Sequence, residues 1–318
     1  MVKLNMIKTA VVVAAFAVAA ASPAFAEMKP KRLTIFTSVS GSSWYGIGAG
    51  MAEIFARQGV QSNPELGAAL SNIANVAANK GELGFSMSPA ITVAKNGEKP
   101  FGAPVTNVAV IAALSESLMH IIVDGEEGFE TVGNLKGHPF VTQNPGSITA
   151  VVFTEVLKAY GLGERDLSLS KGSLTEQRDA LKDRRSEGIV SIASFPSSCG
   201  AELASTIPID RLPISDEAFS ALKSRMPTAG RSMIPANSYK GQTKDVPTVS
   251  AMMILVAPAD MSNDEAYWMA KTLAEQLESV RGLHASYAKL TVAQMADVPG
   301  DGLHPGAEKY FREVGALQ

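Results

Sequence analysis

The chain has 318 residues, of which 46% are hydrophobic and 19% are charged, and its formal net charge is −3. This length and composition support packed cores in two domains or in one large domain. The acidic balance and the lack of a Lys/Arg-rich stripe exclude a nucleic-acid-binding protein. The single cysteine, Cys199, cannot form an internal disulfide, and we interpret it as a small buried or half-buried residue.

The N-terminus has the pattern of a secretion signal. Lys3 and Lys8 supply positive charge, and residues 10–21 form an apolar run that is short for a membrane span. Residues 24–26 (Ala-Phe-Ala) form a small-x-small cleavage site. We expect cleavage after Ala26 and a soluble, periplasmic mature protein. The alternative, an uncleaved anchor helix, is disfavoured by the short, Ala-rich run.

The sequence that follows the signal predicts a strand, a turn and a helix, in that order. Residues 33–37 have the pattern of a strand, and a Ser/Gly-rich turn at residues 37–43 follows it. A helix from about Tyr45 comes next, and Asn63-Pro64 breaks it. The apolar residues on one face of this helix are Ile47, Met51, Ile54 and Phe55.

Further strands and an amphipathic helix lead to the middle of the chain. The helix has an apolar stripe formed by Leu70, Ile73, Ala74 and Ala77. Residues 84–87 predict a short strand, and residues 108–114 and 119–123 predict two central strands. Residues 124–128 form a polar turn.

A second Ser/Gly-rich turn, at residues 143–147, has the same context as the first. It follows a predicted strand at residues 139–142 and precedes a helix that begins at about Thr149. The predicted buried face of this helix contains Val152, Phe153, Val156, Leu157 and Tyr160.

The last third of the chain continues the alternation of strands and helices. Ser173 to Glu176 fits a capping box that starts a helix over residues 175–183. Residues 188–194 predict a buried strand, residues 248–257 the strongest late strand, and residues 266–280 one long helix. The alternation predicts α/β layers with mostly parallel sheets, which bind ligands beyond the carboxyl ends of their strands.

The two Ser/Gly-rich turns are the candidate functional features. A helix start leaves N–H groups unpaired and carries partial positive charge, so the two turns predict two half-sites for one small anionic ligand. Such loops most often only connect elements, and this alternative stays open for each turn. The candidate ligand-binding residues lie in these turns and at neighbouring element ends: Ser42, Ser43, Tyr45, Asn72, Ser88, Asn144, Gly146, Ser147, Thr149, Phe195 and Pro196.

Motifs of enzymes and metal sites do not occur in the sequence. It contains no G-x-S-x-G nucleophile elbow, no G-x-x-x-x-G-K-[ST] phosphate loop and no H-E-x-x-H metal motif. We interpret His120, in an apolar strand, as a hydrogen-bonded core residue. We interpret Glu126 and Glu127 as part of a solvated turn and not as a pair of catalytic carboxylates. The sequence therefore predicts a protein that is not an enzyme and that has no cofactor, and it identifies no metal-ligating residues.

With these elements in place, the chain resembles the TAXI-type solute receptors of TRAP transporters over nearly its whole mature length. The resemblance rests on residues 41–48, 67–72, 134–137 and 144–149, and most specifically on two late segments. These are residues 234–242 (Ile-Pro-Ala-Asn-Ser-Tyr-Lys-Gly-Gln), followed by residues 245–249, and residues 303–307 (Leu-His-Pro-Gly-Ala) with Tyr310 and Glu313. We interpret His304 as structural.

The resemblance implies an α/β fold of the type II periplasmic-binding-protein class, with two lobes and a ligand cleft between them. It places residues 27–125 and 249–318 in lobe I and residues 126–248 in lobe II, with crossings near residues 123–128 and 245–249. It implies a receptor that closes on a dicarboxylate or a glutamate-like amino acid and delivers it to the membrane permease subunits of a TRAP transporter.

The sequence also departs from the family pattern. The first loop contains less glycine than the loop of the family. Within residues 81–89, Gly84 replaces an acidic residue of the family pattern, and Pro89 replaces the polar residue at its end. These changes predict a less polar cleft and a smaller or different ligand. Two alternatives remain: a ligand-sensing subunit of a membrane signalling system, and a periplasmic enzyme on the same fold.

Overall fold

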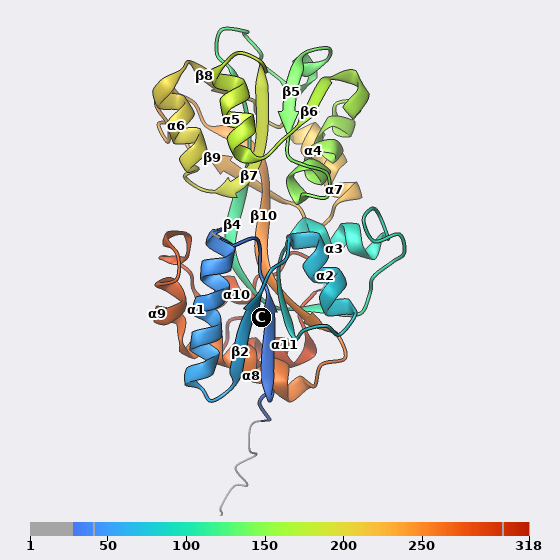
Figure 1. The fold of residues 1–318 in the computed structure, drawn as a ribbon, viewed down its shortest axis with the longest axis vertical. Helices are drawn as coiled ribbons and strands as arrows, with labels where there is room; N and C mark the ends of the chain where they lie inside the picture. Colours follow the sequence, from blue (N-terminus) through green and yellow to red (C-terminus); the bar gives the residue numbers. More distant parts are fainter. Residues whose placement is uncertain (1–27, 41, 301, 318) are drawn as a thin grey trace, which may run out of the picture.

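The computed structural model describes residues 28–40, 42–300 and 302–317. The predicted signal segment therefore lies outside the described residues, as does Gly41 of the first turn. The described elements form two lobes, one above the other in Figure 1, and two long strands run from one lobe into the other. The described strands join in one ten-stranded sheet with the order β2-β1-β3-β10-β4-β7-β5-β6, in which β8 also pairs with β4 and β9 with β10.

The lower lobe in Figure 1 contains three parallel strands. β1 (Arg32–Phe36) lies between β2 (Gln61–Glu65) and β3 (Leu83–Met87). α1 (Ser43–Arg57), α2 (Ala69–Ala77) and α3 (Ser88–Lys95) alternate with these strands. The apolar face predicted for the first helix is buried in α1, which confirms the helical spacing.

β2 corrects one prediction. Asn63 and Pro64 do not simply break the first helix, because they lie in a strand that pairs with β1. β2 is at the end of the sheet order, where proline is tolerated and polar residues are common. The polar sequence of β2 therefore suits an edge strand.

The upper lobe contains a second parallel set. β5 (Pro139–Thr142) lies between β6 (Ser168–Lys171) and β7 (Gly188–Ser194). The helices of this lobe are α4 (Ile148–Ala159), α5 (Leu174–Lys182), α6 (Ser198–Thr206) and α7 (Asp216–Arg225). The capping box predicted at Ser173 and Glu176 is present at the start of α5.

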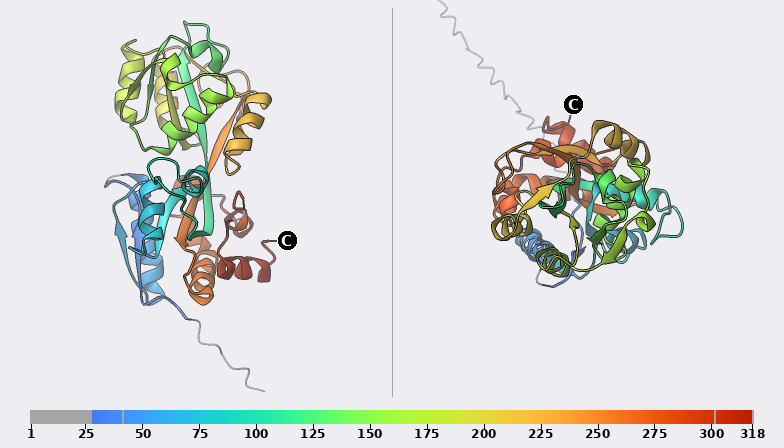
Figure 2. Two further views of the ribbon diagram at one scale, coloured as in Figure 1. Left: turned by 90° about the vertical axis from the view of Figure 1, so that its right-hand side faces the viewer. Right: turned by 90° about the horizontal axis from the view of Figure 1, so that it is seen from above.

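The two long strands are β4 (Val108–Asp124) and β10 (Val246–Pro258), which are antiparallel to each other. Figure 2 shows them passing through the waist between the lobes. The sequence predicted two strands where β4 is continuous. The Ser115 and Ser117 side chains are buried within the sheet, so this polar stretch does not interrupt the strand.

Short strands complete the pairing of the long ones. β8 (Ile209–Arg211) pairs with the last part of β4, and β9 (Gly230–Ile234) pairs with the first part of β10. These pairs and the β4–β10 pair are antiparallel, so the sheet is mixed and not mostly parallel. The exact lobe boundaries given above stay a prediction.

Helices cover both faces of the sheet. α2, α3, α4 and α7 contribute to a core on one face, in which the Phe140 and Phe153 rings stack at 4.9 Å. α1, α8 (Asn263–Glu275), α10 (Val292–Ala296) and α11 (Pro305–Glu313) contribute to a core on the other face. The long helix predicted over residues 266–280 is two helices, because the backbone turns at Gln276 between α8 and α9 (Leu277–Arg281).

His304 has the structural role that the sequence predicted. It is buried and caps α11, where its Nδ1 accepts a hydrogen bond from the Gly306 N–H at 3.2 Å. Its Nε2 lies 3.1 Å from the Met261 carbonyl oxygen. Burial lowers the pKa of His304, so the imidazole stays neutral at physiological pH.

Candidate functional site

Two strands of opposite lobes end at the same point of the sheet. β3 ends at Met87, which lies opposite Met253 of β10. β7 ends at Ser194, which lies opposite Ser117 of β4. Ser117 in turn pairs with Ala251, two residues from Met253, so β3 and β7 approach the middle of the long strands from opposite directions.

The neighbouring strands end at this point as well. β1 is parallel to β3, and β5 is parallel to β7, so their carboxyl ends have the same orientation. α1, α3, α4 and α6 each follow one of these four strands, and they begin between the lobes (Figure 1). In open α/β sheets, the place beyond the carboxyl ends of the strands is where ligands bind.

The first predicted turn caps α1. Ser42 accepts a hydrogen bond from the Tyr45 N–H at 3.2 Å, and its hydroxyl donates to the Val39 carbonyl oxygen at 2.7 Å. Ser43 is exposed, and Tyr45 is half-buried. Trp44 between them packs against the core, with its ring 6.2 Å from that of Phe85.

The second predicted turn caps α4 in the same way. Ser147 accepts a hydrogen bond from the Ala150 N–H at 3.1 Å, and its own N–H donates to the Asn144 carbonyl oxygen at 3.1 Å. Gly146 has a φ of +83°, which favours glycine, and both Gly146 and Asn144 are exposed. Among the residues that the structure describes, no acceptor is found for the Ser147 hydroxyl proton.

Asn72, one of the candidate ligand-binding residues, lies in the first turn of α2. Its side chain is fully buried, and its Nδ2 donates to the carbonyl oxygens of Thr37 at 2.7 Å and Phe85 at 2.8 Å. Its Oδ1 accepts from the Ala68 N–H at 3.1 Å. The amide is therefore used in holding β1, β3 and α2 together, and it has no free group for a ligand.

Ser88 and Thr149 also use their hydroxyl groups within the fold. Ser88 is buried, and its oxygen accepts from the Met252 N–H at 3.1 Å. Thr149 is buried, and its oxygen accepts from the Ile192 N–H at 3.2 Å. Both residues link a helix start to a neighbouring strand, and neither side chain is exposed at the surface.

A third turn follows β7, and the sequence reasoning found only part of it. Phe195, one of the candidate ligand-binding residues, has 38% of its surface exposed and precedes Pro196, another candidate. Ser197 then caps α6, where its oxygen accepts from the Gly200 N–H at 3.2 Å. The strand–serine–helix order that identified the first two turns is repeated here, and this signal could have identified Ser197.

A buried polar cluster lies behind this third turn. The Tyr239 hydroxyl oxygen accepts a hydrogen bond from the Ser197 N–H at 2.6 Å, and the Arg211 guanidinium lies 3.7 Å from the centre of the Tyr239 ring. His120 contacts the same ring edge-on at 6.0 Å. His120 is a core residue, but the predicted hydrogen bond is wrong, since neither ring nitrogen has a partner among the described residues.

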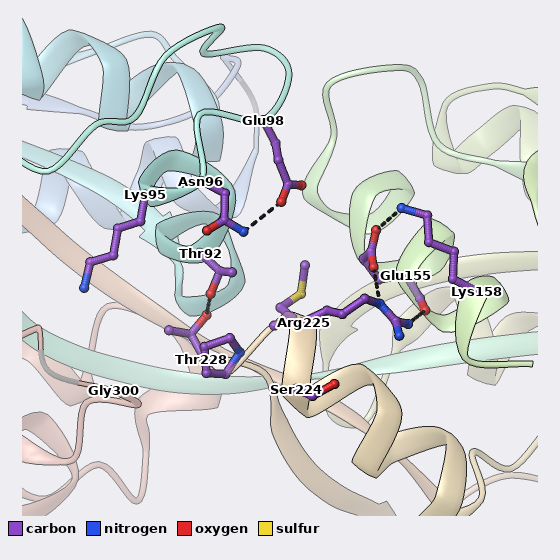
Figure 3. Close-up of a pocket in the computed structure, with 12 residues that line it drawn as sticks. Thr92, Lys95, Asn96, Glu98, Glu155, Lys158, Ser224, Arg225, Thr228 and Gly300 are labelled. Atoms are coloured by element: carbon purple, nitrogen blue, oxygen red, sulfur yellow. Dashed lines mark hydrogen bonds and ion pairs between the residues drawn. The ribbon is translucent and has the colours of Figure 1, made fainter.

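A cavity of about 660 Å³ lies elsewhere between the lobes, beside α3, α4 and α7 (Figure 3). Glu155 lies in its wall, where its carboxylate contacts Lys158 at 2.5 Å and Arg225 at 2.8 Å. Burial opposes ionisation of Glu155, but these two cations outweigh it and lower the pKa. None of the predicted ligand residues lines this cavity.

The described part of the chain contains neither a metal-site cluster nor a membrane-spanning helix. Within residues 28–40, 42–300 and 302–317, no cluster of His, Cys, Asp or Glu has the arrangement of a metal site. In the same ranges, no helix has the length and apolar character that crossing a bilayer requires.

The family assignment follows from a match that extends over both lobes. Residues 35–315 match the NMT1-like family. The chain belongs to the NMT1-like family. The TAXI subtype stays a prediction.

Two solved structures share the fold of this chain. The structure is similar to PhnD1 from Prochlorococcus marinus in complex with methylphosphonate, with a TM-score of 0.55 and 10% identity over 91% of this chain and 100% of that one. It is also similar to the periplasmic aliphatic sulphonate binding protein SsuA from Escherichia coli, with a TM-score of 0.50 and 14% identity over 91% and 84%. The predicted two-lobed α/β binding-protein fold is therefore confirmed.

Proposed function

We propose that the chain is an extracytoplasmic receptor that captures a small organic anion between its lobes. The observation that carries this proposal is the register of the sheet. β3 and β7 end opposite the middle of the two long strands, so the helix starts of both lobes lie around one place. A solute there is held by both lobes at once.

The chemistry of the helix starts supports an anionic solute. Ser42, Ser147 and Ser197 each cap a helix with one side-chain hydrogen bond, and the other N–H groups of the first turn remain available. These groups and the helix dipole favour negative charge. The two structural neighbours described above bind a phosphonate and a sulphonate, which are anions as well.

The connection between the lobes supports a hinge mechanism. β4 and β10 pass through the waist and can bend there while each lobe keeps its own helices and strands. A solute that contacts both lobes favours the closed form, since closure is where all of its contacts are made. The receptor would then present the closed form to a membrane protein.

The solute class and the partner come from the sequence resemblance. We propose a dicarboxylate or a glutamate-like amino acid as the solute, and the permease subunits of a TRAP-type transporter as the partner. Binding without turnover is supported by the serines of the turns. Their oxygens accept hydrogen bonds from backbone N–H groups, and among the described residues no hydrogen bond joins a histidine to Ser147 or Ser197.

The test uses the chain from residue 27 onward and a panel of succinate, L-glutamate, methanesulfonate and methylphosphonate. We expect at least one anion to raise the Tm and to bind with micromolar affinity in calorimetry, which corresponds to about −8 kcal/mol. The same anion should lower the radius of gyration in solution scattering and be recovered unchanged by mass spectrometry. An unchanged Tm and scattering profile with every compound would contradict the proposal.

A further inference from the structure

The segment from Ile234 to Gln242, which carries much of the sequence resemblance, reaches the third turn through Tyr239. Tyr239 is buried, and its hydroxyl oxygen accepts the hydrogen bond from the Ser197 N–H. Its ring carries the guanidinium of Arg211 at 3.7 Å from the ring centre. The segment therefore connects the start of α6 to a buried cation.

Arg211 has no acidic partner among the described residues. Its side chain is only 8% exposed, and its Nη2 donates to the Gly200 carbonyl oxygen at 3.2 Å. Its Nε has no hydrogen-bond partner in the described structure. Asp210, the preceding residue of β8, is exposed, and successive side chains of a strand point to opposite faces. A buried cation that has no acidic partner is costly, so its retention calls for an explanation.

Burial lowers the pKa of Arg211, and the charge of the exposed Asp210 carboxylate offsets this effect only in part. Burial and the charge of Arg211 lower the pKa of His120 to about 3. Burial raises the pKa of Cys199 and that of Tyr239. All three side chains are therefore uncharged near neutral pH, and both ring nitrogens of His120 are also unpaired in the described structure.

The guanidinium lies directly beside the N-terminal turn of α6. A Cβ atom at Gly200 would lie 2.9 Å from Nη2 of Arg211, so glycine permits this close approach. The start of a helix already carries partial positive charge. Helix and guanidinium thus add positive potential at the third turn, in a buried environment where charges are screened less than in water.

We propose that Arg211 is a positioning and charge-selecting residue of the solute site: it holds the third turn through Gly200 and Tyr239 and makes that turn selective for anions. This inference rests on the proposed function and adds the group that supplies the charge. Arg211 acts through the turn Ser197 to Gly200 and does not itself touch the solute.

The experiment compares the wild type with Arg211→Met, Arg211→Gln and Arg211→Lys. Calorimetry measures the affinity for succinate, for L-glutamate and for their uncharged side-chain counterparts, succinamide and L-glutamine. We expect Arg211→Met and Arg211→Gln to weaken binding of the anions at least tenfold and to change binding of the amides less than twofold. Arg211→Lys should restore part of the anion affinity because it keeps the charge.

Stability of the unliganded protein separates this role from a purely structural one. Replacement of a buried, unpaired ion by an apolar side chain of similar volume is often neutral or stabilising, so the Tm of unliganded Arg211→Met should equal or exceed that of the wild type. Equal weakening of anion and amide binding, a clear fall in Tm, failure of both neutral variants to fold, or unchanged anion affinity would each overturn the inference.

If the wild type binds anions and Arg211→Met binds them equally well, the receptor proposal stands and only this inference fails. If the wild type binds none of the four anions tested for the proposed function, both fail.

Discussion

The hydroxyl groups of Thr92 and Thr228 lie 2.6 Å apart and form a buried hydrogen bond between α3 and the segment that leads to β9. The bond is drawn in Figure 3, at the edge of the cavity between the lobes. We expect Thr92→Val or Thr228→Val alone to lower the free energy of unfolding by about 1–3 kcal/mol, because each leaves one buried hydroxyl unpaired. The double variant should lose less than the sum of the two, and urea denaturation of all four proteins measures the difference. Strictly additive losses would contradict a direct coupling.

Ser147→Ala should weaken solute binding and also lower stability. The cap of α4 contributes about 1 kcal/mol to stability, and a hydroxyl that meets a buried charge adds about 1–3 kcal/mol to binding. Ser215→Ala is the matched control, because Ser215 caps α7 with the same bond, to the Ala218 N–H at 3.2 Å. We expect both variants to lose similar stability in denaturation, and only Ser147→Ala to lose affinity in calorimetry. Wild-type affinity in Ser147→Ala would remove Ser147 from the site.

Asn72→Leu should destabilise the lower lobe without a specific effect on the solute. The substitution leaves the carbonyl oxygens of Thr37 and Phe85 and the Ala68 N–H without their side-chain partner, and each buried unpaired group costs about 1–3 kcal/mol. Thermal and urea denaturation should show this loss. Solute affinity measured well below the Tm should change little, and a selective loss of affinity in a fully stable variant would return Asn72 to the binding residues.

The free energy of unfolding should decrease as the pH is lowered, because of His120. Its pKa in the folded state is about 3, lowered by burial and by Arg211 from 6.5. Below pH 6.5 the unfolded chain binds a proton at His120 that the folded protein does not bind. The contribution of neutral His120 to the free energy of unfolding is therefore complete above pH 6.5 and is lost as the pH falls toward 3. The loss approaches about 1.4 kcal/mol per pH unit.

His120→Leu tests this dependence. Both ring nitrogens are unpaired in the described structure, so the variant should be at least as stable as the wild type at pH 7.5. Its free energy of unfolding should fall less steeply between pH 6 and pH 4. The difference in slope should correspond to the one proton that His120 binds in the unfolded wild type. The same slope in both proteins would show that His120 does not titrate as inferred.

Features with local causes were predictable from the sequence. The capping box at Ser173 and Glu176 and the buried face of α1 depend on residues within one or two helical turns. The two Ser/Gly-rich turns were found for the same reason, since each combines a strand end and a helix cap. The α/β class followed from the alternation of such elements.

Features that depend on distant partners were not predictable in this way. Ser115 and Ser117 lie in a continuous strand only because β10 and β7 pair with β4 there, and β2 is a strand only because β1 lies beside it. The cluster of His120, Arg211 and Tyr239 is assembled by three different parts of the chain. No local pattern marks such a cluster, so the sequence identified the exposed turns and missed the charge behind the third one.

The hydrogen bond between Ser88 and Met252 joins residues that are 164 positions apart. The strands β1, β2 and β3 are made early in synthesis, but they cannot complete their sheet until β10 (Val246–Pro258) has left the ribosome. Contacts of such long sequence separation make folding slow. Under the proposed extracytoplasmic function, this delay would keep the nascent chain unfolded while it is exported.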